Sequence, residues 1–281
     1  MAERAAFANA GGSLMGRLNS ILRDRLRGGW LFAALLFVNA PIIIVVLVSF
    51  SPSSVFDLPV SELSLRWYAK LAQSESFSGP LATSLKVALV ATFLSVLLGG
   101  LCALGLWRSS FRGREFLIGL ALSPMMLPGV VIGISLLFYL RSFGITNGFI
   151  SLSIAHVVIT IPYAIRISLS GLSLFDAGLM DAARTLGCSP SAAVMKVLVP
   201  NIAPSLGSAA VFSFLASLDN YSIALFLGDV YTVTLPIQII NALSVGADPM
   251  LAAVSTILLL GTLASFLLTE RLIGLQRIAG A

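Results

Sequence analysis

The sequence predicts an all-α membrane protein with six transmembrane helices and both termini in the cytoplasm. The 281-residue chain is 58% hydrophobic and only 10% charged, whereas a soluble domain carries about a quarter charged residues. Six apolar stretches each reach the ~20 residues that a helix needs to cross a ~30 Å hydrocarbon layer. Basic residues gather on one side of the resulting topology, which orients the spans.

The six predicted spans are helices because backbone groups in lipid must find their hydrogen-bond partners within the segment. They lie at about 30–50, 81–106, 116–140, 149–171, 204–226 and 250–269. A shorter apolar stretch within 228–248 predicts an outer re-entrant or interfacial helix.

The third span contains Pro124 and Pro128, which can kink a helix. Gly129 and Gly133 follow with the spacing that lets helices approach closely, so we expect a packing role in preference to a gating hinge.

The distribution of Lys and Arg places the N-terminus inside. With that orientation, 13 of the 17 basic residues are cytoplasmic, and Arg66, Lys70, Lys86 and Arg141 are outside. The cytoplasmic set is Arg4, Arg17, Arg23, Arg25, Arg27, Arg108, Arg112, Arg114, Arg166, Arg184, Lys196, Arg271 and Arg277. The net charge of +5 therefore reflects topology, and the absence of a clustered basic face argues against nucleic-acid binding.

The predicted organisation has three parts. Residues 1–29 form a cytoplasmic segment with an amphipathic interfacial helix at 16–27, residues 30–271 the six-helix transmembrane domain, and residues 272–281 a cytoplasmic tail. The first span is too long for the core of a signal peptide and no clear small-residue cleavage site follows it, so we expect an uncleaved anchor.

The longest cytoplasmic loop, 172–203, predicts two short helices. Asp176 can cap the first, and Gly187 supplies a residue suited to a left-handed stop. Ser189 and Pro190 start the second helix as a cap and first-turn proline, and Pro200 is expected to end it. On physical grounds alone, this loop could equally be an ordinary helical hairpin linking two spans.

The loop resembles the EAA loop of ABC importer permeases. That pattern is Glu-Ala-Ala, three residues, Gly, nine residues, and Ile-x-Leu-Pro. The chain has Asp181-Ala182-Ala183, Gly187 and Val197-Leu198-Val199-Pro200 at the same spacing, with conservative changes at three positions. The resemblance implies a type I ABC importer permease architecture whose loop docks in a groove of the nucleotide-binding subunit. The implied ATPase-coupling residues are Asp181, Ala182, Ala183, Gly187, Ser189, Pro190 and Pro200.

Other segments are similar to the spermidine/putrescine permease branch of this family. They include SLRWYAKL (64–71), LSPMMLPGVVIGISLL (122–137), HVVITIPYAIR (156–166) and SLDNYSIALFL (217–227). The resemblance implies a polyamine cargo and a multi-pass location in the bacterial inner membrane. The implied partners are an ATPase homodimer, a second and different permease subunit, and an extracytoplasmic substrate-binding protein.

The chain is not expected to be an enzyme. The sequence has no G-x-x-x-x-G-K-[ST] phosphate-binding loop, so ATP and Mg²⁺ are expected in the partner ATPase and no cofactor in this chain. His156, the only histidine, has no suitably placed ligands for a metal site, and we expect a hydrogen-bonded histidine within the membrane.

Asp219 is the main candidate for the substrate pathway. It lies about 15 residues past the start of the fifth span, roughly 23 Å along a helix rising ~1.5 Å per residue. An ionisable group at that depth normally faces a cavity or a partner. Either a cationic substrate or a neighbouring helix could be that partner. Asn220 and Tyr221 complete the candidate set, and Asn220 replaces a second acid that is common in the branch.

Three alternatives remain open from the sequence. The same machinery could import an opine, an aminoalkylphosphonate or another small organic solute. An ion-driven secondary transporter would predict inverted repeats, and no convincing repeat is present. An intramembrane enzyme would need clustered acids, histidines or a nucleophile with its base, whereas Asp219 and His156 are single residues on different predicted helices.

Overall fold

The computed structural model describes residues 27–55, 59–60, 62–246 and 248–273. Regular secondary structure within these ranges is helical throughout. The predicted interfacial helix at 16–27 lies outside them except for its last residue, as does the predicted tail from residue 274 onward.

Five helices are long and apolar enough to cross a membrane, and a bent pair makes a sixth crossing. The five are Arg27–Ser49, α3 (Glu75–Arg108), α6 (Gly148–Ser173), the continuous helix Pro190–Leu218, and α12 (Pro249–Ile273). Shorter helices are α2 (Arg66–Ala72), α7 (Gly178–Thr185), α10 (Tyr221–Leu227) and α11 (Leu235–Val245). The six predicted spans are therefore present, and α11 is the predicted short outer helix.

The sequence predicted the third span as a single helix, whereas the structure divides it into two arms. The first arm comprises α4 (Arg114–Leu122) and a 3₁₀ turn, η1 (Ser123–Met126), and meets α5 (Gly129–Ser142) at 102°. Leu127 is extended, with φ −91° and ψ 143°, because the ring of a following proline disfavours helical backbone. Pro128 then begins the second arm as its N-cap.

The glycines beyond this break give α10 a close approach to α5, as predicted. A Cβ atom on Gly133 would lie 2.9 Å from Cδ2 of Phe226 and 3.3 Å from the backbone oxygen of Ser222. A Cβ on Gly129 would lie 3.1 Å from that of Ser222. The absence of side chains thus lets the two helices pack directly.

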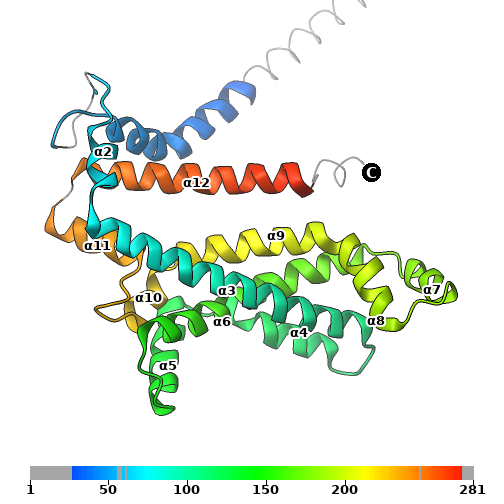
Figure 1. The fold of residues 1–281 in the computed structure, drawn as a ribbon. Coiled ribbons are helices and arrows are strands. Elements are labelled where there is room, and N and C mark those ends of the chain that lie inside the picture. Colours follow the sequence, from blue (N-terminus) through cyan, green and yellow to red (C-terminus); the bar gives the residue numbers. More distant parts are fainter. Residues whose placement is uncertain (1–26, 56–58, 61, 247, 274–281) are drawn as a thin grey trace, which may run out of the picture.

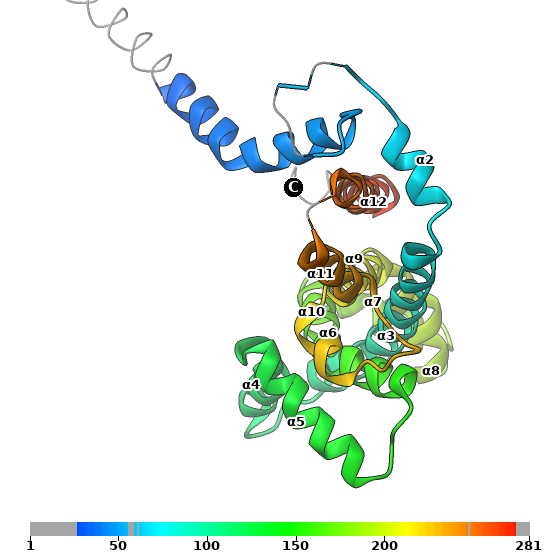
Figure 2. The same cartoon turned by 90° about the vertical axis from the view of Figure 1, so that its left-hand side faces the viewer.

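Helices α3, α6 and α9 (Val199–Leu218) form the centre of the molecule and pack against one another over much of their lengths. Figure 2 shows Arg27–Ser49 on the far side of α12 from this centre. In Figure 1, α7 and α8 (Pro190–Ala193) lie at the same end as the C-terminal ends of α3 and α12, with α2, α10 and α11 at the opposite end. This arrangement matches the predicted topology.

The central helices are joined by buried polar groups as well as apolar packing. Ser95 of α3 and Thr160 of α6 are hydrogen-bonded through their hydroxyls at 2.7 Å, and His156 Nδ1 lies 2.7 Å from Ser217 Oγ on α9. The prediction of a hydrogen-bonded histidine is confirmed. Transmembrane helices often use such contacts because lipid offers no competing partner.

The close contact between α3 and α6 requires a glycine at position 99. A Cβ at Gly99 would lie 2.7 Å from the Cβ of Ala164, whereas one at Gly100 would meet its nearest neighbour, Leu206 Cδ2, at 3.5 Å. Gly99→Ala should therefore destabilise the protein by about 1–3 kcal/mol through overpacking. Thermal unfolding in detergent should show a lowered Tm for this variant but not for the Gly100→Ala control. Equal Tm values for the two variants would contradict the packing.

Asp229 connects the end of α10 to the beginning of α6. Its Oδ2 accepts from Gly148 N at 3.0 Å, and its Oδ1 accepts from Tyr231 N at 2.9 Å and from the Thr232 hydroxyl at 2.8 Å. Asn147 Oδ1 caps the same helix by accepting from Ile150 N at 3.0 Å. The hydrogen bond from the Thr232 hydroxyl, assisted by backbone N–H groups, lowers the pKa of Asp229 from its ordinary value.

A lowered pKa means that ionised Asp229 stabilises the fold above the pKa of the unfolded chain, about 3.9, and that this stabilisation is lost as the pH falls through the folded-state pKa. Asp229→Asn should therefore lower the Tm at pH 7, and the difference from wild type should shrink below about pH 4. Paired thermal melts from pH 7 downward measure this difference. A gap that stays constant across the range would argue against an ionised cap.

Candidate functional site

The predicted coupling loop has the expected corner. Helix α7 ends at Thr185, and Gly187 adopts φ +88°, a left-handed backbone that glycine adopts at little cost. Ser189 Oγ then accepts from Ala192 N at 3.3 Å, and Pro190 is the first residue of α8. The start and stop signals predicted for 185–190 are confirmed.

The first helix of the loop is anchored at its start, and its exposed face is of mixed polarity. Asp176 Oδ1 accepts from Gly178 N at 2.8 Å in the turn before α7, but the N-cap of α7 is Ala177 and not Asp176, the residue that the sequence predicted. Asp181 and Ala182 are exposed, whereas Ala183 is buried against the chain itself. Large apolar side chains are nevertheless left uncovered on and beside the loop helices, namely Leu174, Leu179, Leu186 and Met195.

Pro200 does not end the second helix, contrary to the prediction from the sequence. The helix runs without interruption from Pro190 to Leu218. A π turn, η2 (Val194–Leu198), directly precedes α9. The wider turn accommodates a proline that lacks a donor and would crowd the carbonyl four residues earlier in a regular α-helix. The side chain of Asn201 also donates to the Val197 carbonyl at 2.7 Å.

The base of the loop is fixed to the central helices by an apolar cluster. Buried Ala103 of α3, Leu172 of α6, and Leu198 and Ile202 of the long helix pack together. Trp107, near the end of α3, meets Phe175 edge to face, with ring centroids 6.0 Å apart. A displacement of the loop therefore cannot leave α3 and α9 unaffected, because the contacts form one packed body.

At the other end of the long helix, the chain breaks at Asp219 and Asn220. The predicted span 204–226 was too long, because α9 ends at Leu218 with Asp219 as its C-cap. Asn220 Oδ1 accepts from Ile223 N at 2.9 Å and so caps α10, which begins at Tyr221. The strong N-cap preference of Asn accounts for the new start. Asp219 thus lies at a helix junction and not within a continuous helix.

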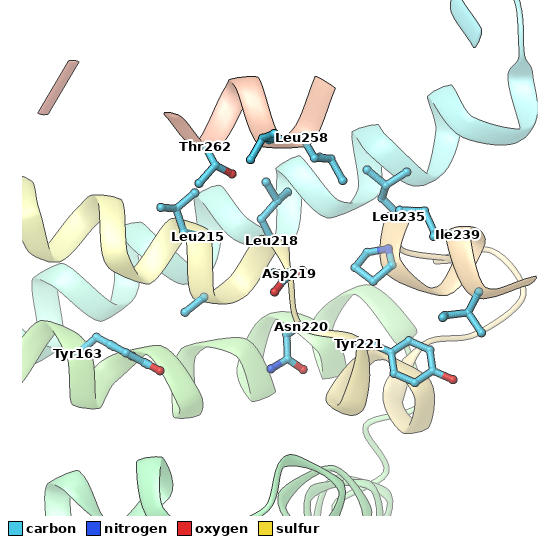
Figure 3. Close-up of a pocket in the computed structure, with 14 residues that line it drawn as sticks. Tyr163, Leu215, Leu218, Asp219, Asn220, Tyr221, Leu235, Ile239, Leu258 and Thr262 are labelled. Atoms are coloured by element: carbon cyan, nitrogen blue, oxygen red, sulfur yellow. The ribbon is translucent and has the colours of Figure 1, made fainter. Parts of the chain in front are cut away.

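This junction opens into a pocket of about 840 Å³ between α6, α9, α11 and α12. Figure 3 shows Asp219 and Asn220 at its middle, with Tyr163 on one side and Tyr221 on the other. Its lining consists of Tyr163, Leu215, Ala216, Leu218, Asp219, Asn220, Tyr221, Leu235, Pro236, Ile239, Ile240, Leu258, Leu259 and Thr262. The structure therefore brings all three predicted pathway residues together.

Asp219 is the acidic member of this lining. Its side chain is exposed, and among the described residues no Lys or Arg forms an ion pair with it. The remaining wall is mostly aliphatic, with phenol rings at positions 163 and 221. An exposed carboxylate in a mostly aliphatic pocket favours a cationic ligand.

The sequence did not single out Tyr163 or the walls from α11 and α12. The available signal for Tyr163 was its place directly after Pro162 in a predicted span. Leu235, Ile239 and Thr262 reach the pocket from elements distant in sequence, and no local pattern marks them. The predicted coupling residues and the predicted pathway residues lie toward opposite ends of Pro190–Leu218, so the structure does not join them in one site.

Comparison with known proteins assigns the fold and the family. Residues 95–270 match the family of binding-protein-dependent transport system inner membrane components. The chain is 32% identical to the spermidine/putrescine transport system permease protein PotC of Haemophilus influenzae, over 87% of this chain and 95% of that protein. It is 34% identical to PotC of Escherichia coli K12, over 83% and 88%. The putrescine transport system permease protein PotI of the same strain is 27% identical, over 83% and 87%.

Solved structures share the fold at lower identity. A bacterial alginate ABC transporter, in complex with an alginate pentasaccharide-bound periplasmic protein, has a chain that matches with a TM-score of 0.67 at 14% identity, over 94% of this chain and 98% of that one. A second alginate importer structure matches with a TM-score of 0.62 at 17% identity, over 92% and 95%. The predicted type I ABC importer permease architecture is confirmed.

The family match covers α6, α9, the C-terminal part of α3, the predicted coupling loop and the residues that line the pocket, and the similarity to PotC extends over most of the chain. The apolar helices agree with a multi-pass protein of the bacterial inner membrane. The chain belongs to the family of binding-protein-dependent transport system inner membrane components.

Proposed function

We propose that this chain is a permease subunit that imports a polyamine, of the spermidine or putrescine kind, and takes its driving force from a separate ATPase through residues 172–203. The observation that carries the proposal is the exposed Asp219 carboxylate in a largely apolar pocket, joined by one helix to the coupling loop. The relatives named for spermidine and putrescine transport support the choice of cargo.

The proposed docking surface for the ATPase is the outer face of α7 and α8. Asp181, Ala182 and the corner at Gly187 are exposed there. Leu186 is 86% exposed and Met195 66% exposed. On the cytoplasmic side, apolar groups exposed to this extent are typical of a protein interface. The shape of this surface is set by Gly187, Ser189 and Pro190. Pro200 lies within the long helix that connects this surface to the pocket.

The pocket has the chemistry for a linear, flexible dication or trication. A carboxylate can accept charge-assisted hydrogen bonds from an ammonium group. The tyrosine rings at positions 163 and 221 can attract a cation through their faces, and the aliphatic wall suits the methylene units between the amines. Asn220 and Tyr221 are proposed as pathway residues together with Asp219.

The remaining parts of the machine are proposed as partners. ATP and Mg²⁺ would be bound by an ATPase homodimer, the substrate delivered by an extracytoplasmic binding protein, and the pathway completed by a second permease subunit. The exposed faces of Arg27–Ser49 and of α5, with Phe138 and Tyr139, leave room for lipid or that second subunit.

Reconstitution tests the proposed function. The permease pair, ATPase and binding protein are placed in proteoliposomes, and uptake of radiolabelled spermidine is measured with and without ATP. Saturable uptake that needs both ATP and the binding protein supports the proposal. Uptake of an opine or an aminoalkylphosphonate but not of a polyamine would retain the importer and reject its cargo. Uptake that follows an ion gradient without ATP would reject both.

The coupling role predicts a selective effect at Gly187. In Gly187→Ala, an alanine at φ +88° costs about 1–2 kcal/mol and should misalign the corner. ATP-driven uptake and substrate-stimulated ATP hydrolysis should each fall roughly fivefold, measured at an equal amount of assembled protein. Gly113→Ala is the matched control, because Gly113 has φ +98° and open space around it in the α3–α4 loop. Similar losses in both variants would point to general strain and contradict a coupling role.

The pathway role predicts that removing the charge of Asp219 impairs polyamine uptake. Loss of a charge-assisted hydrogen bond of about 1.5–3 kcal/mol should lower the uptake rate of Asp219→Asn roughly tenfold or more. Asp248→Asn serves as the control, because Asp248 pairs with Lys70 at 3.2 Å and does not line the pocket. Unchanged spermidine uptake by Asp219→Asn, measured under ATP, would remove Asp219 from the pathway.

A further inference from the structure

His156 lies next to the pocket without lining it. Its side chain is buried on α6, and its Nδ1 atom is 2.7 Å from Ser217 Oγ on α9. Ser217 is itself buried and precedes Asp219 by two residues. The ring therefore reaches the turn of α9 from which the carboxylate enters the pocket.

Ser217 belongs to the closing turn of α9. Its backbone oxygen accepts from Asn220 N at 3.3 Å, and Asp219 N donates to Leu215 O at 3.1 Å. Asn220 continues into the cap of α10. A displacement of Ser217 would therefore move both Asp219, the C-cap of α9, and Asn220, the N-cap of α10, because these residues follow Ser217 in one hydrogen-bonded turn.

Position 156 is itself held by neighbouring polar contacts. The Thr160 hydroxyl donates to the His156 carbonyl at 2.6 Å, and Ser95 on α3 is 2.7 Å from the same hydroxyl. These contacts fix the backbone of α6 at position 156 against α3. Buried polar groups thus form a chain from Ser95 through Thr160 to the His156 carbonyl, and the contact of the ring with Ser217 extends it to α9.

The second ring nitrogen contributes nothing to this chain. His156 Nε2 is buried and has no hydrogen-bond partner among the described residues. A buried polar atom without a partner costs stability, so apolar packing alone does not explain an imidazole at this position. The contact through Nδ1 is the feature that a leucine or phenylalanine could not supply.

We propose that His156 is a positioning residue, which fixes the Asp219 carboxylate in the pocket by holding Ser217 in the last turn of α9. The inference rests on the proposed function, because it treats Asp219 as part of the polyamine pathway. His156 acts through Ser217 and is not expected to contact the substrate.

Asparagine and leucine separate positioning from packing at this site. Asn places a polar group near the Nδ1 position and removes Nε2, whereas Leu fills space without a hydrogen bond. In the assembled importer, His156→Leu and Ser217→Ala should each lower spermidine uptake roughly fivefold, and His156→Asn should retain at least about half of the wild-type rate. Ser168→Ala, which removes a buried hydroxyl without a partner from the same helix, should leave the rate unchanged.

A chemical readout of position 219 makes the test independent of transport. Cys102 and Cys188 are replaced by serine, Asp219→Cys is introduced, and its rate of reaction with a cationic methanethiosulfonate reagent is measured in the assembled complex. His156→Leu should change this rate about threefold or more, while His156→Asn and Ser168→Ala should stay within about twofold of the parent.

The outcomes separate this inference from the proposed function. If the thiol introduced by Asp219→Cys reacts at the same rate with and without His156→Leu, the positioning role is overturned, whatever the uptake shows. Equal uptake losses in His156→Leu and His156→Asn also overturn it, because they reduce the role to packing. Altered reactivity in a complex that imports no polyamine would retain the positioning role and reject the cargo.

Discussion

Backbone that leaves a helix within a membrane must find partners for its peptide groups, because lipid supplies none. The junction at Asp219 and Asn220 satisfies this requirement locally. The turn of α9 closes on Leu215 and Ser217, and the side chain of Asn220 accepts from the N–H of Ile223 in the first turn of α10. The pocket, the separate direction of α10 and the exposure of Asp219 all depend on this junction, since an uninterrupted helix would leave no opening there.

The same helix links two ends of the molecule with different chemistry. From Pro190 to Leu218 it has 29 residues, a length of about 44 Å at 1.5 Å per residue. One end carries a corner with exposed apolar side chains, and the other opens into a pocket with an exposed carboxylate. Because Leu198 and Ile202 pack against α3 and α6 near the corner, a force applied to the loop is transmitted to the central helices and not absorbed by a flexible linker.

Local signals in the sequence predicted part of this structure well. The positive φ of Gly187 and the cap by Ser189 depend on single residues and their immediate neighbours, and both were predicted. The number of apolar spans follows from hydropathy alone. The break in the third span was foreshadowed by Pro124 and Pro128, but its 102° angle depends on what α5 packs against.

Where tertiary packing decides, the sequence misled or gave no signal. Pro200 reads locally as a helix end, yet a π turn before it lets the helix continue. A long apolar run concealed the end of α9 at Leu218, and only the cap by Asn220 reveals the new start. The lining of the pocket by Tyr163 and by α11 and α12 arises from contacts distant in sequence, which one sequence without known contacts does not specify.

Above all, we propose that the exposed Asp219 carboxylate at the junction receives the cargo. A structure of the assembled importer with spermidine, trapped during ATP hydrolysis by vanadate, tests this claim most directly. We expect density for the polyamine in the pocket, with an amine nitrogen about 3 Å from an Asp219 oxygen and its methylene units against the aliphatic wall. Spermidine bound elsewhere along the permease, with Asp219 paired to a residue of the second subunit, would contradict it.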